Sequence, residues 1–360
     1  MKLKIFIGLA LVSIFWTSCS KKPTVTTSQS DNQTAQPTTG LPFQPTLVEP
    51  PETKEIYAIK RQADALIASK DFDKLDTVAE DFRTSQACYA HGVWKLSYFY
   101  EGLNFPAGGS TDSEWTNHFA ILRNWVETKP DSITARVAFA NGLIEYAWQA
   151  RSHDFADKVT DEGWKLFFQR LNQAVIVLNG AKNLKEKCPY WWAAMLRAEL
   201  GLQTERSKYD ATFNTAIQTW PNCTPFYFLR SNFLLPRWYG SDGELQKDLE
   251  QSANKIGGEA GDMIYAQVIW NLNGMVSSKN LFEEYNFSWE RANKGLEAIK
   301  KSYPNSLAVK NESAHLAAIA NDLKTAKKYF DQTGGQIDIS CWASTNQFVD
   351  CAQFVYESVQ

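Results

Sequence analysis

The residues that could carry out chemistry in this 360-residue chain do not fall into a familiar catalytic pattern. No two histidines lie three or four residues apart, the spacing that zinc enzymes use on a helix; the four are His91, His118, His153 and His315. The sequence also lacks a Gly-rich phosphate loop after a strand and a Gly-x-Ser-x-Gly elbow. An enzymatic role is therefore uncertain and disfavoured, and we expect no cofactor and no metal site.

Two acidic pairs could serve as the carboxylates of a glycosidase. They are Asp161-Glu162 and Glu283-Glu284. Adjacent residues on a helix point about 100° apart, so exposure to solvent is the better interpretation of both pairs. His153 next to Asp154 likewise favours a helix cap over an acid–base pair.

The cysteine pattern includes one residue near the N-terminus and five further along the chain. Five thiols cannot all pair within one chain, so at least one stays free or pairs between chains. The possible disulfide partners are Cys188 with Cys223, at equivalent junctions before Pro189 and after Pro221, and Cys341 with Cys351. No Cys-x-x-Cys spacing indicates a metal site.

Tryptophan is abundant, with 13 residues in the chain. In a helical protein most of them fill the space between helices. Trp191 and Trp192 are adjacent, so we expect one of them, Trp192, to be partly exposed. An exposed aromatic side chain can stack on a sugar or anchor a protein partner.

The first 18 residues have the features of a secretory leader. Lys2 and Lys4 precede the apolar or small stretch from Ile5 to Trp16, which is too short to cross a bilayer as a helix. Ser18-Cys19 resembles the lipobox of bacterial lipoproteins, although Trp16 replaces the usual Leu. The resemblance implies acylation at Cys19, a membrane attachment through the lipid, and a place in the cell envelope. Ser20, in place of Asp, favours the outer membrane.

A Pro- and Thr-rich segment, residues 19–51, follows the leader. Only Asp31 and Glu49 are acidic between Pro23 and Pro51, and apolar clusters are scarce. Such a composition buries too little apolar surface to offset the entropy of ordering the chain. The sequence therefore predicts a disordered tether.

Helical periodicity dominates residues 52–360. One apolar stripe follows the spacing of an amphipathic helix and ends at Gly180; it consists of Trp164, Phe167, Phe168, Leu171, Val175 and Leu178. The segment from Ile133 to Trp148 is apolar on more than one face, so we expect it to be packed between neighbouring helices. The fold class predicted is all-α.

Prolines between helical segments indicate repeated helix pairs; they are Pro130, Pro189, Pro221 and Pro304. The segments that precede Pro221 and follow Pro304 are similar to the tetratricopeptide repeat. Phe213 with Ala216, and Ala326 with Phe330, take the packing positions of the second helix. Arg197 and Ala314 replace the expected Gly. We predict an irregular tetratricopeptide-like helical-repeat solenoid of antiparallel helix pairs over residues 52–360.

Three short segments resemble a family of uncharacterised bacterial proteins with a helical, tetratricopeptide-like domain of unknown function. They are Leu234–Ser241 with its Arg-Trp-x-Gly-Ser motif, Ala147–Arg151, and Trp220-Pro221. The resemblance supports the fold and implies no reaction. The motif turn has two interpretations. Either Arg237 and Trp238, with Gly240 and Ser241, contact a ligand, or Trp238 fills a gap between helices and Gly240 supplies a positive φ.

The charge balance limits the classes of partner that the sequence predicts. Lys and Arg total 37 against 40 for Asp and Glu, so the chain has no basic excess that would indicate nucleic-acid binding. We expect a lipid-anchored scaffold that binds a protein or peptide in the cell envelope. The alternative is an envelope protein that binds or cleaves glycans with exposed tryptophans and acidic residues.

Overall fold

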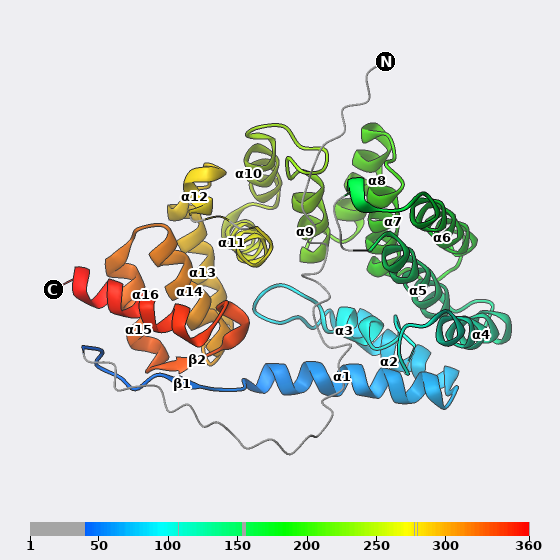
Figure 1. The fold of residues 1–360 in the computed structure, drawn as a ribbon, viewed down its shortest axis with the longest axis horizontal. Helices are drawn as coiled ribbons and strands as arrows, with labels where there is room; N and C mark the ends of the chain where they lie inside the picture. Colours follow the sequence, from blue (N-terminus) through cyan, green and yellow to red (C-terminus); the bar gives the residue numbers. More distant parts are fainter. Residues whose placement is uncertain (1–39, 107, 153–155, 277, 279, 360) are drawn as a thin grey trace. The chain divides into compact units, whose positions relative to one another are not determined.

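The computed structural model describes residues 40–106, 108–152, 156–276, 278 and 280–359, and these residues are almost entirely helical (Figure 1). They form two compact units, which we call the N-terminal unit (residues 54–242) and the C-terminal unit (residues 40–53 and 243–359). The predicted all-α class is confirmed. The leader and Cys19 lie outside the described residues, as does His153.

The N-terminal unit contains nine of the described α-helices, the first of which begins in the residues just before it. They are α1 (Pro51–Ala68), α2 (Phe72–Ser85), α3 (Lys95–Glu101), α4 (Asp112–Thr128), α5 (Ile133–Arg151), α6 (Asp161–Gly180), α7 (Pro189–Gly201), α8 (Arg206–Thr219) and α9 (Thr224–Phe233), with a 3₁₀ turn at Ala156–Lys158. From α4 onward each helix packs on the next, and α5 meets α7 as α7 meets α9. This nearest-neighbour packing is that of a helical-repeat solenoid.

The C-terminal unit continues the same architecture and adds two short strands. Its helices are α10 (Glu244–Ile256), α11 (Gly258–Met275), α12 (Leu281–Glu284), α13 (Trp289–Ser302), α14 (Leu307–Ile319), α15 (Leu323–Thr333) and α16 (Thr345–Ser358). Strand β1 (Thr46–Leu47) pairs in parallel with β2 (Gln336–Ile337), and a 3₁₀ turn at Ile339–Cys341 leads to α16.

Side-chain caps determine where many of the helices begin. Thr111 and Glu114 form a capping box at α4, in which the Thr111 backbone N–H donates to the Glu114 carboxylate at 2.9 Å. Ser132, Ser306 and Asp322 cap α5, α14 and α15 through their side-chain oxygens.

Two predicted repeats appear as helix pairs with the expected core residues. Phe213 and Ala216 are buried on α8 against α7, and Ala326 and Phe330 are buried on α15 against α14. The position of the missing glycine is occupied differently in the two pairs. Ala314 is fully buried, whereas Arg197 forms an ion pair with Glu145 of α5.

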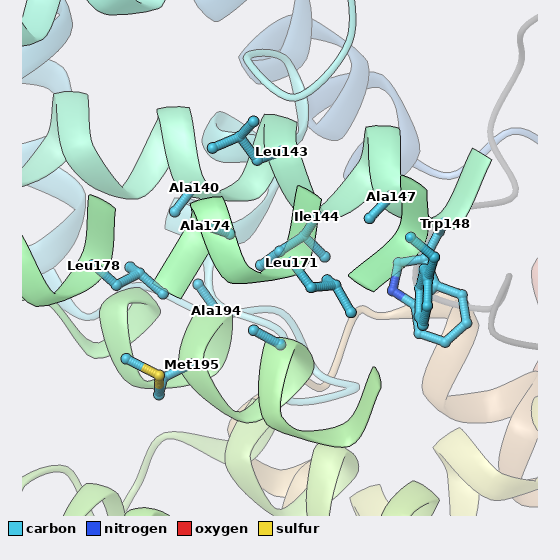
Figure 2. Close-up of a cluster of buried hydrophobic side chains, with 12 residues drawn as sticks. Ala140, Leu143, Ile144, Ala147, Trp148, Leu171, Ala174, Leu178, Ala194 and Met195 are labelled. Atoms are coloured by element: carbon cyan, nitrogen blue, oxygen red, sulfur yellow. The ribbon is translucent and has the colours of Figure 1, made fainter. Parts of the chain in front are cut away.

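The core of the N-terminal unit lies where α5, α6 and α7 meet (Figure 2). Alanines on all three helices allow close approach, and larger side chains fill the remaining space; the labelled residues include Ala140, Ile144, Leu171, Ala174, Ala194 and Met195. Helix α5 is buried over most of its surface and packs on α4, α6 and α7, as its apolar composition predicted. Helix α6 ends at Gly180, as predicted.

The described end of the predicted tether differs from the expectation. Residues 40–50 are ordered and pack on the C-terminal unit through β1 and through Leu41 and Phe43. Two main-chain hydrogen bonds and two aromatic contacts of Phe43 offset the low apolar content of this segment. A disordered tether therefore remains a prediction only for residues 19–39, which lie outside the described residues.

Candidate functional site

The motif turn and the Ala147–Arg151 segment come together, although they are some ninety positions apart in sequence. Trp238 follows α9, packs on the α5–α6–α7 core, and meets Trp148 edge to face with 6.2 Å between ring centroids. Trp148 lies at the C-terminal end of α5 (Figure 2). The Arg151 guanidinium lies 5.7 Å from the centroid of Trp148 and 5.4 Å from that of Trp164. This contact favours the packing interpretation of Trp238, which is only half-buried.

Gly240 is required for a different reason from the one predicted. Its φ is not positive; instead, a Cβ placed there would lie 1.8 Å from the Leu234 carbonyl oxygen. The turn folds back on the end of α9 so closely that only glycine fits. Arg237 is half-buried and Ser241 is exposed.

Trp192 is half-buried at the start of α7, as is its neighbour Trp191. Their ring centroids lie 4.6 Å apart in an edge-to-face arrangement, and the Trp191 indole N–H donates to the Leu178 carbonyl at 2.7 Å. Trp191 is thus held by the core, while Trp192 retains a partly accessible face.

All five cysteines among the described residues are free thiols. Cys188 and Cys223 take the same place in their repeats, immediately before α7 and α9, and both are buried. Burial raises the pKa of the Cys223 thiol well above its usual range, and the nearby Cys188 and Cys88 raise it further. Neither of the two possible disulfides, Cys188 with Cys223 and Cys341 with Cys351, is formed among the described residues.

The acidic pairs are exposed, as the sequence interpretation favoured. Asp161 and Glu162 lie in the first turn of α6, and Glu283 and Glu284 lie on α12, all in contact with solvent. Acidic residues in a first helical turn stabilise the positive end of the helix dipole. Among the described residues, no group of three His, Cys, Asp or Glu side chains is arranged to hold a metal ion.

A cluster that the sequence analysis missed lies on the helices of the N-terminal unit. It consists of Lys60 on α1, Glu101 on α3, Glu145 on α5 and Arg197 on α7, and we call it the inner charged cluster. Lys60 forms an ion pair with Glu101, and Arg197 forms one with Glu145. The carboxylates are nearly buried, at 4% and 8% exposure, whereas the cations retain 21% and 14%.

Burial and neighbouring charges change the protonation of this cluster. Burial raises the pKa of Glu101 to about 7, because it outweighs the opposing effect of Lys60, and the nearby Glu145 raises it further. The cluster therefore gains or loses a proton near neutral pH. Lys60 also lies 5.3 Å from the centroid of the Tyr98 ring, and the Tyr98 hydroxyl is 2.9 Å from His91 Nε2. Burial lowers the pKa of His91 to about 4.

The arrangement fixes two cationic side chains at the edge of a buried polar region. An ammonium group offers three hydrogen-bond donors and a guanidinium offers five, which suits recognition of carboxylate or carbonyl oxygens. The four members come from four helices, so their spacing gave no motif. The available signal was a charged residue inside an otherwise apolar helix, as at Glu145 and Arg197.

A second polar cluster lies in the C-terminal unit on α14. Asn273 donates to the Glu312 carboxyl at 3.0 Å, and His315 donates from Nδ1 to the Cys341 carbonyl at 3.0 Å. Burial raises the pKa of Glu312 to about 8 and lowers that of His315 to about 4. The imidazole contacts the backbone of Cys341, and burial raises the pKa of the Cys341 thiol well above its usual range. These groups are therefore neutral near pH 7 and do not form an activated cysteine nucleophile.

The chain matches no protein-family model, no curated protein and no solved structure. Among the described residues, no helix is both long and apolar enough to span a membrane.

Proposed function

We propose that the protein is a lipid-anchored helical-repeat scaffold that binds a protein or peptide partner in the cell envelope. The leader with its lipobox-like Cys19 supports the location, and the stacked helices support the binding role. Each repeat adds one helix to a continuous surface, so a partner can be contacted by side chains from several repeats at once.

The inner charged cluster is the observation that carries this proposal. Lys60 and Arg197 keep part of their surface accessible. The nearly buried carboxylates of Glu101 and Glu145 form ion pairs with them and fix their positions. A cation fixed in this way loses little conformational freedom when it binds, which favours affinity. A carboxylate or a row of carbonyl oxygens on a partner chain is the chemical group that these donors fit.

The envelope glycan-binding or glycan-cleaving alternative also has a specific observation in its favour. Glu145 is close enough to Glu101 for its charge to help raise the pKa of Glu101, which is about 7. A carboxyl group with a raised pKa can act as a general acid. Each of the two carboxylates nevertheless forms an ion pair, with Lys60 or with Arg197, so the binding role is better supported than catalysis.

Crosslinking in intact cells, followed by purification of the tagged full-length protein, tests the scaffold role. The test variant is the double substitution Glu145→Gln with Arg197→Gln, which removes both charges and leaves no buried ion without a partner. The control is Lys165→Gln on α6. The Lys165 side chain is exposed, and its ion-pair partner among the described residues is Glu162.

Wild type and the control should recover the same partner, and the double variant should recover about tenfold less, since charge-assisted hydrogen bonds contribute about 1.5–3 kcal/mol. Thermal melts establish that the variants are folded. Failure to recover any reproducible partner, or equal recovery by all three proteins, would rule out the proposal. Hydrolysis of a cell-wall polysaccharide that Glu101→Gln abolishes would establish the alternative.

A further inference from the structure

The segment before α1 lies along β2 and α16 in the manner of a bound peptide, and we call the surface that it covers the groove. Strand β1 adds to β2 in parallel, with Thr46 opposite Gln336 and Leu47 opposite Ile337. The backbone N–H of Thr46 donates to the Gly335 carbonyl at 2.8 Å, and that of Val48 donates to the Ile337 carbonyl at 3.0 Å. Main-chain pairing of this kind provides affinity without depending on the sequence of the added strand.

Side chains of the segment alternate between the groove and solvent. Leu41, Phe43 and Pro45 are partly buried, and the residues between and just after them, Pro42, Gln44 and Thr46, are exposed. This period of two is that of an extended chain with one face on a surface. Leu47 is also exposed, at 59%, so the groove contacts every second residue only from Leu41 to Pro45.

Phe43 is the residue of the segment that contacts aromatic side chains of the C-terminal unit. The Phe43 ring lies 5.7 Å from Tyr356, edge to face, and 6.2 Å from Phe348, measured between centroids. Both partners are on α16, and Phe43 with Leu41 packs on the buried core of α14, α15 and α16. Phe348 and Tyr356 thus form an aromatic surface against which Phe43 packs.

Gly335 has no side chain, and this leaves room for the backbone of the segment. Its φ is +83°, and a Cβ at this position would lie 2.5 Å from the Gln44 carbonyl oxygen and 2.9 Å from the Phe43 ring. Gly334, the residue before it, has a φ of +59° but open space where its Cβ would be. The two glycines share a left-handed backbone, and only Gly335 contacts the segment.

Strand β2 and the residues after it are bonded to a fully buried side chain of α14, Asn311. Its amide donates to the Gln336 carbonyl at 3.1 Å, and its oxygen accepts from the Asp338 backbone at 3.2 Å and from the Trp342 indole at 2.9 Å. These bonds, to β2 itself and to the residues that follow it, attach the strand to α14. None of them involves the segment that pairs with β2.

We propose that the groove along β2 and α16 is a binding site for an extended, proline-containing peptide with an aromatic side chain, and that residues 41–48 fill it as an internal ligand that a partner segment replaces. The chemistry of the ligand follows from the occupant in place: few charges, prolines that reduce the entropy lost on binding, and one aromatic residue. This site is independent of the inner charged cluster.

The test uses the purified full-length chain and a fluorescein-labelled synthetic peptide of residues 40–50, with binding followed by fluorescence anisotropy. In wild type the internal segment competes at the high effective concentration of a tethered ligand, so binding should be weak. The double variant Thr46→Pro with Val48→Pro removes both donors to β2 while keeping an extended backbone. Its matched control, Thr46→Ala with Val48→Ala, keeps both donors.

The proline variant should bind the peptide about thirtyfold more tightly than wild type or the alanine control, since the two lost hydrogen bonds weaken the competing segment by about 1 kcal/mol each. In the proline background, Gly335→Ala should abolish binding and Gly334→Ala should not, because both have the same backbone strain and only the first blocks the groove. A peptide in which Phe43 is replaced by Ala should bind more weakly.

Two results would overturn the proposal. One is the absence of saturable binding by the proline variant when its circular dichroism and melting temperature match those of the alanine control. The other is a concentration-dependent dimer of wild type that the proline substitutions abolish, which would assign the groove to a second copy of the chain. None of these substitutions touches the inner charged cluster, so the outcome is separate from that of the crosslinking experiment.

Discussion

At the scale of single residues, Trp238 distinguishes a packing role from a ligand-binding role. Its ring lies against the core of α5, α6 and α7 and meets Trp148 edge to face. Truncation to Ala should leave a cavity there and lower the free energy of unfolding by about 3 kcal/mol, the lower end for large aromatic side chains because Trp238 is half-buried.

A thermal melt of Trp238→Ala measures this loss directly. Trp238→Phe keeps a ring in the gap and should recover most of the stability, while Ile176→Ala, at a side chain 70% exposed, should change it little. A melting temperature within a degree or two of wild type for Trp238→Ala would contradict the packing role and return Arg237 and Trp238 to the candidate ligand contacts.

Glu312 and His315 make the stability of the C-terminal unit depend on pH. Burial raises the pKa of Glu312 from 4.5 to about 8, so the unfolded chain releases this proton first and stability falls as the pH rises from about 4.5 to 8. Burial lowers the pKa of His315 from 6.5 to about 4, so its contribution is lost as the pH falls from 6.5 to 4. The two effects oppose each other between 4.5 and 6.5, and Glu312 acts alone above that range.

Glu312→Gln keeps the hydrogen bond from Asn273 and removes the ionisation. Denaturant unfolding at pH 6.5 and pH 8 should therefore show wild type losing up to about 2 kcal/mol more than the variant over this interval. Asp338, whose pKa burial also raises, is present in both proteins and cancels in the comparison. Parallel pH profiles for the two proteins would show that Glu312 does not carry the effect.

At the scale of helices and strands, close contacts depend on glycines inside helices. Gly295 on α13 faces α11 so closely that a Cβ would lie 2.0 Å from the Asp262 carbonyl oxygen. Gly295→Ala should push the two helices apart and destabilise the unit by about 2 kcal/mol or more, despite the higher helix propensity of alanine.

Gly180→Ala provides the matched comparison, because Gly180 is also helical and its nearest neighbour is the end of the flexible Arg136 side chain. Thermal denaturation should show this second variant unchanged or slightly more stable. A Gly295→Ala protein as stable as wild type would mean that α11 and α13 can separate at no cost.

The elements also show which parts of the fold follow from local sequence. The α6 stripe and its end at Gly180, the all-round burial of α5, and the pairs at Phe213–Ala216 and Ala326–Phe330 depend on spacing within one or two helices, so they could be predicted. Strand β1 could not, because its stability comes from β2, nearly 300 positions later in the chain. The inner charged cluster was missed for the same reason, since Lys60, Glu101 and Arg197 meet only through tertiary packing.

At the scale of the whole molecule, the attachment to the membrane is the feature on which the proposed location depends. Cys19 is the only residue proposed to carry acyl chains, and buried methylenes contribute about 0.8 kcal/mol each to membrane affinity. No helix among the described residues is long and apolar enough to span a bilayer. Twenty residues separate Cys19 from Gly40, the first described residue.

Cys19→Ser should abolish acylation and move the protein from the membrane fraction to the soluble envelope fraction, because the acyl chains at Cys19 supply the proposed membrane affinity. Metabolic labelling with palmitate, followed by fractionation, measures both effects in one experiment, and Cys351→Ser serves as the control for loss of an unrelated thiol. Label that persists in Cys19→Ser, or a wild type that takes up none, would refute the lipoprotein assignment. Because the segment is held to the C-terminal unit by the pairing of β1 with β2, loss of the lipid should leave the groove and the melting temperature unchanged.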